Sequence, residues 1–173
     1  MKFCCILLVL ITSYMTTNGQ ESRKISELLF LTGEWSVEVE ARLSMQGPWE
    51  SSKAKSVIRF TLDSALIEEE FTGSREGKPF LAKTFFAVNN MSNNFQRTFI
   101  DSPHGVLVDF EGARSSDSLI FDKNFQYANG NVVKLRVVYK ILSSEEVVVS
   151  SMRMAQNSTT WDVNGRMKYH RLK

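Results

Sequence analysis

Apolar and polar residues alternate along most of the chain after residue 33, and a period of two is typical of β-strands with one buried face. The clearest example is the segment 34–40, in which Trp35, Val37 and Val39 fall on one face and the polar residues on the other. The pattern recurs and predicts about ten strands. These cover residues 34–45, 49–62, 65–72, 80–88, 95–101, 106–113, 119–122 (the weakest), 132–142 and 147–154, and a last strand that begins at Trp161 or Met167 and ends at Leu172.

Turn-forming residues separate the predicted strands and indicate short connections. Gly73–Lys78 is expected to form a hairpin loop, Ser102–Gly105 a turn, and Asn129-Gly130 a tight two-residue hairpin connection. No helical stretch is long enough to connect parallel strands, so neighbouring strands should be antiparallel. An open sheet of this size exposes two edges, and closure into a barrel removes them. The sequence therefore predicts an all-β fold, an antiparallel up-and-down barrel of about ten strands, in preference to a two-sheet sandwich.

The segment before the first strand predicts a short helix. Apolar residues recur at near-helical spacing between positions 25 and 31, after the polar Ser22 and before Gly33. We expect the helix to run from about Ser22 to Leu31 and to plug one end of the barrel. The alternative is a loosely docked N-terminal arm.

The first 19 residues have the features of a secretory signal peptide. A basic Lys2 is followed by an apolar run at 3–11 and by small and polar residues at 12–19, which predicts cleavage near Gly19-Gln20. The apolar run is shorter than the roughly 20 residues that a membrane span needs. The predicted domains are therefore 1–19 signal peptide, 20–32 N-terminal helix or arm, and 33–173 β-barrel. We expect a secreted or periplasmic protein with no stable membrane anchor after cleavage.

Composition and charge argue against several classes of function. Both cysteines lie in the predicted signal, so the mature chain has no disulfide or thiolate chemistry. Removing Lys2 leaves 20 basic residues against 19 acidic ones, a balance that predicts no nucleic-acid partner. No Gly-x-Ser-x-Gly motif is present, and the two histidines lack a second ligand at metal-binding spacing. We therefore expect neither an enzyme nor a metalloprotein.

Two further features leave questions open. Asn90 and Asn157 begin matches to the N-glycosylation pattern in predicted turns, and these matter only if the source is eukaryotic. The sequence does not specify the oligomeric state.

Gly33-x-Trp35 at the start of the first strand, after a short helix, is similar to the opening of lipocalin-like (calycin) barrels. The resemblance implies that Trp35 closes one end of the barrel and that Arg171, from the last strand, stacks across it. Such a contact is a favourable cation–π interaction. This pair is expected to serve structural closure.

A more specific resemblance covers nearly all of the mature chain. The matching segments, in order, are residues 28–35, 68–73, 77–80, 95–102, 110–112, 136–141 and 169–171. With these segments the chain resembles an exported bacterial family catalogued as domain of unknown function 1579. The resemblance implies a lipocalin-like barrel with no established activity. Ala87-Val88-Asn89 replaces the family's Gly-Tyr-Asp, and Phe99 replaces a tryptophan, so a polar site that used that tyrosine and aspartate would be missing here.

The most favoured function is non-covalent binding of a small, partly apolar ligand inside the barrel. Glu69 faces inward if Ile67 and Phe71 do, and a buried carboxylate would need a partner such as Arg97, Arg136 or Lys83. Alternatively, Glu69 is exposed or forms an internal ion pair. Arg97 and Asp101 share a face with Phe99 and predict either a mixed pocket wall or a solvent-facing pair. The candidate ligand-binding residues are Glu69, Arg97, Phe99, Asp101, Arg136 and Tyr139.

Two other functions compete with ligand binding. An enzyme would use Glu69 or Asp101 as a general acid or base on an exported small molecule. A structural or interaction module would have a solid barrel. Related haem-binding barrels hold iron through a histidine near the last strand, where His170 lies, but Val37 and Val39 replace small residues of that group. We expect no cofactor, and haem binding through His170 is disfavoured.

Overall fold

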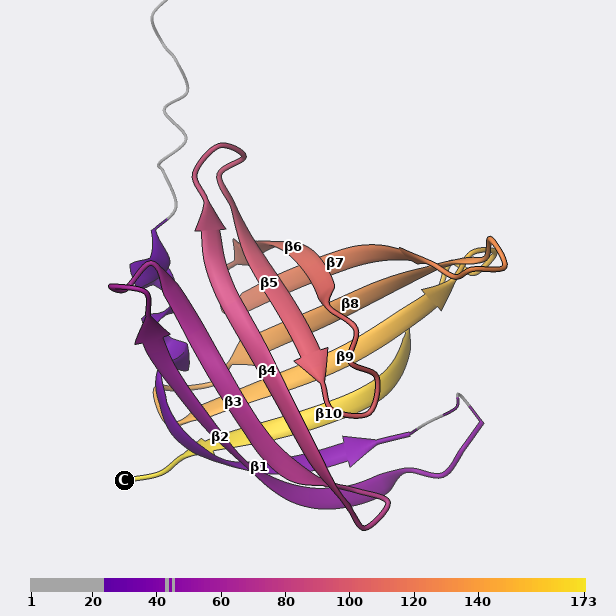
Figure 1. Ribbon diagram of the computed structural model, residues 1–173, viewed down its shortest axis with the longest axis horizontal. Coiled ribbons are helices and arrows are strands. Elements are labelled where there is room, and N and C mark those ends of the chain that lie inside the picture. The colour runs from indigo at the N-terminus through magenta and orange to yellow at the C-terminus, as the bar shows by residue number, and fades with distance from the viewer. Residues whose placement is uncertain (1–23, 43, 45) are drawn as a thin grey trace, which may run out of the picture.

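The computed structural model describes residues 24–42, 44 and 46–173. Within these residues, ten antiparallel strands form one closed barrel, in which each strand pairs with its neighbours in sequence and the last pairs with the first (Figure 1). The predicted up-and-down barrel is confirmed. The predicted signal peptide and the first residues of the predicted helix lie outside the described residues.

A short 3-10 helix precedes the barrel. The elements are η1 (Ile25–Leu31), β1 (Gly33–Ala41), β2 (Glu50–Thr61), β3 (Leu66–Arg75), β4 (Lys78–Asn89), β5 (Asn94–Asp101), β6 (Val108–Ser115), β7 (Ser118–Gln126), β8 (Val132–Ile141), β9 (Glu146–Ala155) and β10 (Asp162–Arg171). None of the helices in the described part of the chain is long and apolar enough to cross a membrane.

Several strand boundaries differ from the prediction because pairing extends beyond the apolar pattern. Strands β3 and β4 pair as far as Arg75 and Lys78, so the loop expected at Gly73–Lys78 shrinks to Glu76 and Gly77. The strand expected at 119–122 is nine residues long, since β7 pairs with β8 along its whole length. The last strand begins at Asp162, next to the earlier of its two expected starts, and a register shift in the β9–β10 pairing lies between Val163 and Gly165.

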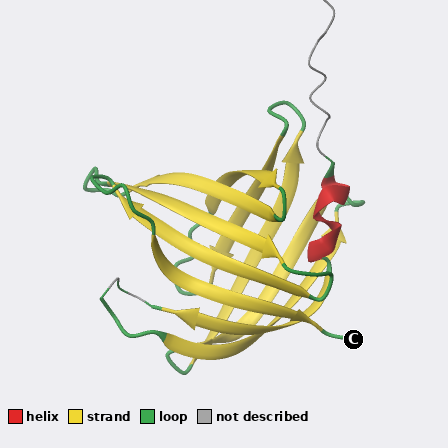
Figure 2. Ribbon diagram, turned by 180° about the vertical axis from the view of Figure 1, so that it is seen from behind, coloured by secondary structure: helices red, strands yellow, loops and turns green. Residues whose placement is uncertain are grey.

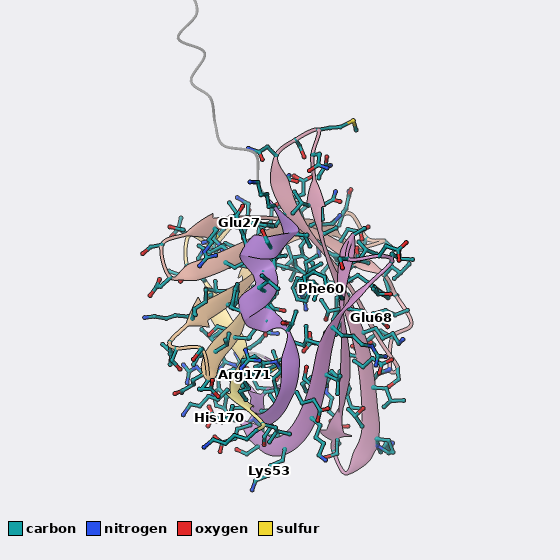
Figure 3. The ribbon with its side chains drawn as sticks, turned by 90° about the vertical axis from the view of Figure 1, so that its left-hand side faces the viewer. Glu27, Lys53, Phe60, Glu68, His170 and Arg171 are labelled. Carbon is teal, nitrogen blue, oxygen red and sulfur yellow. The ribbon has the colours of Figure 1, made fainter. Side chains whose placement is uncertain are left out.

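Helix η1 covers one end of the barrel (Figure 2). Its Leu28 and Leu31 are buried in the core, and the Trp35 indole N–H donates a 2.8 Å hydrogen bond to the Leu31 carbonyl oxygen. Arg171 donates from its guanidinium to the carbonyl oxygens of Phe30 (2.9 Å) and Thr32. Figure 3 looks onto this end, where η1 crosses the view and Arg171 lies at the end of the helix. We call this side of the barrel the closed half.

The burial of inward-facing side chains changes along the barrel axis. In the closed half they are buried, as Val37 and Phe95 are. Two to four residues further from the closed end, the inward-facing side chains of the same strands are only partly buried. Some of these residues are in the middle of their strand rather than at its end. We call this side the open half, and its partly buried apolar side chains are Val39, Phe71, Phe99, Val108, Leu135 and Met167.

The barrel wall is incompletely paired between β6 and β7. Their pairing runs only from Glu111 and Asp122 to Ser115 and Ser118. Residues 108–110 of β6 pair with β5, and the part of β7 after Asp122 pairs with β8. The two strands therefore part toward the open half, and we call this opening the β6–β7 seam.

Candidate functional site

Glu69 belongs to a layer of buried polar side chains between the closed and open halves. It alternates on β3 with the inward-facing Ile67 and Phe71 and is 3% exposed. Its Oε1 accepts hydrogen bonds from the Ser56 hydroxyl (2.8 Å) and the Tyr169 hydroxyl (2.9 Å). A buried carboxylate needs such donors, and these two hold Glu69 in one orientation.

Arg97 is the second charged member of this layer. It lies on β5, is 7% exposed, and donates from Nε to the Tyr139 hydroxyl at 3.1 Å. Its guanidinium carbon lies 5.1 Å from the ring centroid of Phe99 and 5.1 Å from that of Phe110. Two aromatic faces therefore stabilise the cation. No described carboxylate lies within 4.0 Å of the guanidinium.

The two tyrosines of the layer remain protonated at neutral pH. Burial raises the pKa of Tyr139 to about 12; nearby Glu69 acts in the same direction and Arg97 in the opposite one. Burial, reinforced by Glu69, raises the pKa of Tyr169 well above its usual value. Both hydroxyls are thus neutral, and Tyr169 can act as the donor that Glu69 requires.

A hollow of about 890 Å³ opens at the β6–β7 seam. This volume falls within the range of about 300–1,000 Å³ that is typical of small-molecule sites. Three side chains with the inward phase of their strands, Phe110, Lys123 and Leu135, line the hollow together with residues of the outer wall. Because Phe110 also stacks on Arg97, the hollow and the buried guanidinium share one aromatic ring. The full lining is Gln96, Thr98, Asp109, Phe110, Glu111, Asp122, Lys123, Asn124, Lys134, Leu135, Arg136, Met154 and Trp161.

The sequence as a whole identifies the family of this barrel. Residues 11–171 match the family described as "Protein of unknown function (DUF1579)". The chain belongs to the DUF1579 family. The resemblance drawn from the sequence segments is therefore confirmed. A comparison with curated protein sequences gave no match.

Two solved structures share the fold of this DUF1579 protein. Rv2717c from M. tuberculosis is 11% identical with a TM-score of 0.61, and the match covers 88% of this chain and 100% of that one. The S-type phycobiliprotein lyase CPES from Guillardia theta is 12% identical with a TM-score of 0.58, and covers 88% of this chain and 95% of its own. At these identities the likeness shows the fold alone.

Four of the six candidate ligand-binding residues lie in the barrel interior, and a fifth, Asp101, has the same inward phase at the rim. Arg97, Phe99 and Tyr139 are in contact around the guanidinium. Glu69 lies in the same polar layer but bonds to hydroxyls rather than to Arg97, Arg136 or Lys83, the partners expected for it. Lys83 instead lies on the outer wall, 2.6 Å from Glu68 and 3.2 Å from Glu70.

Arg136 was wrongly expected in the barrel interior. It lies on the outer wall, with Nε 2.6 Å from Asp122, and its guanidinium stacks over Trp161 at 4.5 Å. The physical reason is parity: Arg136 and Tyr139 are three positions apart on one strand, so they point to opposite faces. Arg136 lines the seam hollow from outside but cannot join the polar layer.

Asp101 matches neither alternative left open by the sequence, a pocket wall with Arg97 or a solvent-facing pair, because it is buried and its carboxylate does not contact Arg97. Its carboxylate accepts a 3.0 Å hydrogen bond from the backbone N–H of His104 and lies 2.9 Å from that residue's Nδ1. These bonds fix the turn that follows β5, because an aspartate side chain readily caps a turn two or three residues on. Asp101 is therefore a turn residue, buried at the rim of the open half.

Trp35 and Arg171 lie together at the closed end, with the guanidinium carbon 4.1 Å from the indole centroid. His170, the neighbour of Arg171, is exposed on the outer face of β10. Among the described residues, no three His, Cys, Asp or Glu side chains are grouped so that they could hold a metal ion.

Sequence reasoning missed two residues of the polar layer, Ser56 and Tyr169, and also Phe110, the ring that stacks on Arg97. Tyr169 alternates with Met167 and Arg171, so its inward direction was available from the strand pattern. Its contact with Glu69 was not, because the two residues come from strands that are distant in sequence and separated by β1 and β2 in the barrel.

Proposed function

We propose that this DUF1579 protein binds a small, partly apolar molecule in the open half of its barrel. The observation that carries the proposal is the set of six partly buried apolar side chains that face the interior there. The closed half is filled by its own side chains, including Trp35 and Phe121. Apolar surface left facing the open half gains about 25 cal/mol for each Å² that a ligand covers.

The seam hollow supports the same proposal. It adds a volume of about 890 Å³ beside the open half, and its inward-facing Phe110 and Leu135 continue the apolar surface. Closed barrels with roughly this number of strands can hold one small ligand. The ligand would reach Phe99 and Leu135 from the open half or through the seam.

The proposed role is binding rather than catalysis. The interior carboxylate of Glu69 is occupied by two hydroxyl donors, and both buried tyrosines keep their protons at neutral pH. Such groups orient a ligand more readily than they exchange protons with it. The signal-like residues 1–19 support an exported protein that meets its ligand outside the cytoplasm.

Titration with the neutral apolar dye Nile red tests the proposal. The mature protein should bind the dye saturably and with one dominant site. Leu135→Gln lengthens the side chain by one atom and places a polar amide on the inner wall, so it should weaken binding several-fold. Lys140→Gln is the matched control, because this side chain lies on the same strand, points outward, is exposed and does not line the hollow.

Two outcomes would contradict the proposal. A barrel with a solid interior would give no saturable dye binding and no ligand-bound species in native mass spectrometry of protein purified from cells. Equal dye affinity in wild type and Leu135→Gln, with both folded by circular dichroism, would place the dye somewhere other than the open half.

A further inference from the structure

We infer that the ligand's polar group is a carboxylate and that Arg97 binds it. This inference rests on the proposed function and adds the chemistry by which the ligand is recognised. It is drawn from the side chain of Arg97, which is buried without a counter-ion in contact among the described residues.

The buried guanidinium of Arg97 has no counter-ion in contact. It is 7% exposed, and its only hydrogen-bond partner among the described residues is the neutral Tyr139 hydroxyl. A buried cation without a paired anion is strongly destabilising. The two aromatic faces of Phe99 and Phe110 offset part of this cost. An anion delivered by a ligand would supply the missing partner.

The terminal nitrogens of Arg97 are open to such an anion. Neither Nη donates to an acceptor in the described part of the chain. Every fully buried side-chain nitrogen and oxygen there has a hydrogen-bond partner. The two Nη groups are therefore reached from solvent. The rings that flank them, Phe99 and Phe110, belong to the open half and to the seam hollow.

The geometry favours a carboxylate over other polar groups. A guanidinium offers parallel N–H donors that match the two oxygens of a carboxylate. Tyr139 holds Nε, which fixes the plane of the guanidinium and leaves the Nη edge available. The rings of Phe99 and Phe110 flank the guanidinium, and the open half presents six partly buried apolar side chains to the interior, so the rest of the ligand should be an alkyl or aromatic body.

Glu69 should act against the ligand's charge. Burial and hydrogen bonds keep its carboxylate in the same polar layer, and both Glu69 and Arg97 influence the pKa of Tyr139. A ligand carboxylate beside Arg97 is therefore repelled by Glu69 across the interior. Replacing Glu69 with Gln removes this repulsion while keeping an acceptor for Ser56 and Tyr169.

The test compares decanoate, decanol and decylamine, which share one alkyl chain, by displacement of Nile red from the mature protein. Wild type should bind decanoate about 10- to 100-fold more tightly than decanol, the range expected for hydrogen bonds to a charged group. Arg97→Met should abolish that preference and Arg97→Lys should retain part of it. Glu69→Gln should tighten decanoate binding and leave decanol unchanged. Arg59→Gln, an exposed arginine on β2, is the charge-matched control.

The outcomes separate this inference from the proposed function. If none of the three compounds displaces the dye and the dye itself does not bind, the proposed function fails and the inference fails with it. If decanol equals decanoate in wild type, the ligand-binding role stands and the carboxylate is wrong. Tightest binding of decylamine would assign recognition to Glu69 instead. If Arg97→Met does not fold, the comparison of decanoate, decanol and decylamine on the wild-type protein still tests whether the ligand's polar group is a carboxylate.

Discussion

We predict that Trp35→Ala lowers the free energy of unfolding by about 4 kcal/mol. The indole is 1% exposed, and a buried tryptophan covers about 150–250 Å². At about 25 cal/mol per Å², that area corresponds to about 4–6 kcal/mol, an upper bound because the unfolded chain is itself partly collapsed. Loss of the hydrogen bond to the Leu31 carbonyl adds about 1 kcal/mol.

Urea unfolding followed by far-ultraviolet circular dichroism measures this loss independently of tryptophan fluorescence. With a slope of about 2 kcal/mol/M, the midpoint should fall by about 2 M. Trp49→Ala is the control, because Trp49 also lies near two guanidinium groups, of Arg42 and Arg166, but is 40% exposed. That variant should lose less than about 1 kcal/mol, so the difference between the two reports burial rather than cation–π stacking.

A loss below about 1 kcal/mol in Trp35→Ala would refute the reasoning, since it would mean that η1 and Arg171 close the barrel without the indole. The milder Trp35→Phe variant should remain folded and bind Nile red as wild type does, because Trp35 lies in the closed half. A Trp35→Phe protein that is fully stable but no longer binds would show that Trp35 contacts the ligand.

Three further predictions concern other parts of the barrel. Stability should fall as pH rises from about 10 toward 12, by about 1.4 kcal/mol per pH unit for each buried tyrosine, because the folded state keeps protons that the unfolded state loses. Urea midpoints across this range should show a shallower fall in Tyr139→Phe than in wild type. Gly112→Ala should cost about 1–3 kcal/mol, since its Cβ would lie 2.7 Å from Phe121 Cε1, and a normal midpoint would exclude that clash. Asp122→Asn should change the unfolding free energy by less than about 1 kcal/mol in thermal or urea melts, because its ion pair with Arg136 is half-exposed, and a larger loss would make that pair structural.

The alternation of side chains was enough to predict the barrel, but not every inward direction. On β5 only one phase is strongly apolar, so Arg97 and Phe99 could be expected inside. On β4 both phases carry large apolar residues, such as Phe85 and Phe86, and the inward direction of Glu69 on β3 stayed conditional on that of its neighbours. On β8 both phases are apolar, since Val132 and Val138 face outward while Val133 and Val137 face inward. The apolar pattern therefore does not distinguish Arg136 from Tyr139, and only their odd spacing shows that the two cannot both face the ligand.

The partners of the interior charges could not be predicted from the sequence. The bond between Glu69 and Tyr169 depends on barrel closure, which brings β3 and β10 close across the interior although β1 and β2 separate them in the sheet. The β6–β7 seam could not be predicted from the sequence for a related reason. Residues 108–110 and 123–126 each alternate like paired strands, but they pair on one side only, and this depends on how the whole sheet curves.

The pairing of β1 with β10 has a consequence for how the chain folds. Trp35 meets Arg171, so the first and last strands of the barrel must find one another across almost the whole described chain. Such long-range closure is entropically slow, and folding on a timescale of about milliseconds to seconds is expected for this topology. Until β10 arrives, β1 and β9 are open edges that can pair with other chains. Loss of the last few residues should therefore cause aggregation during refolding rather than a simple loss of stability.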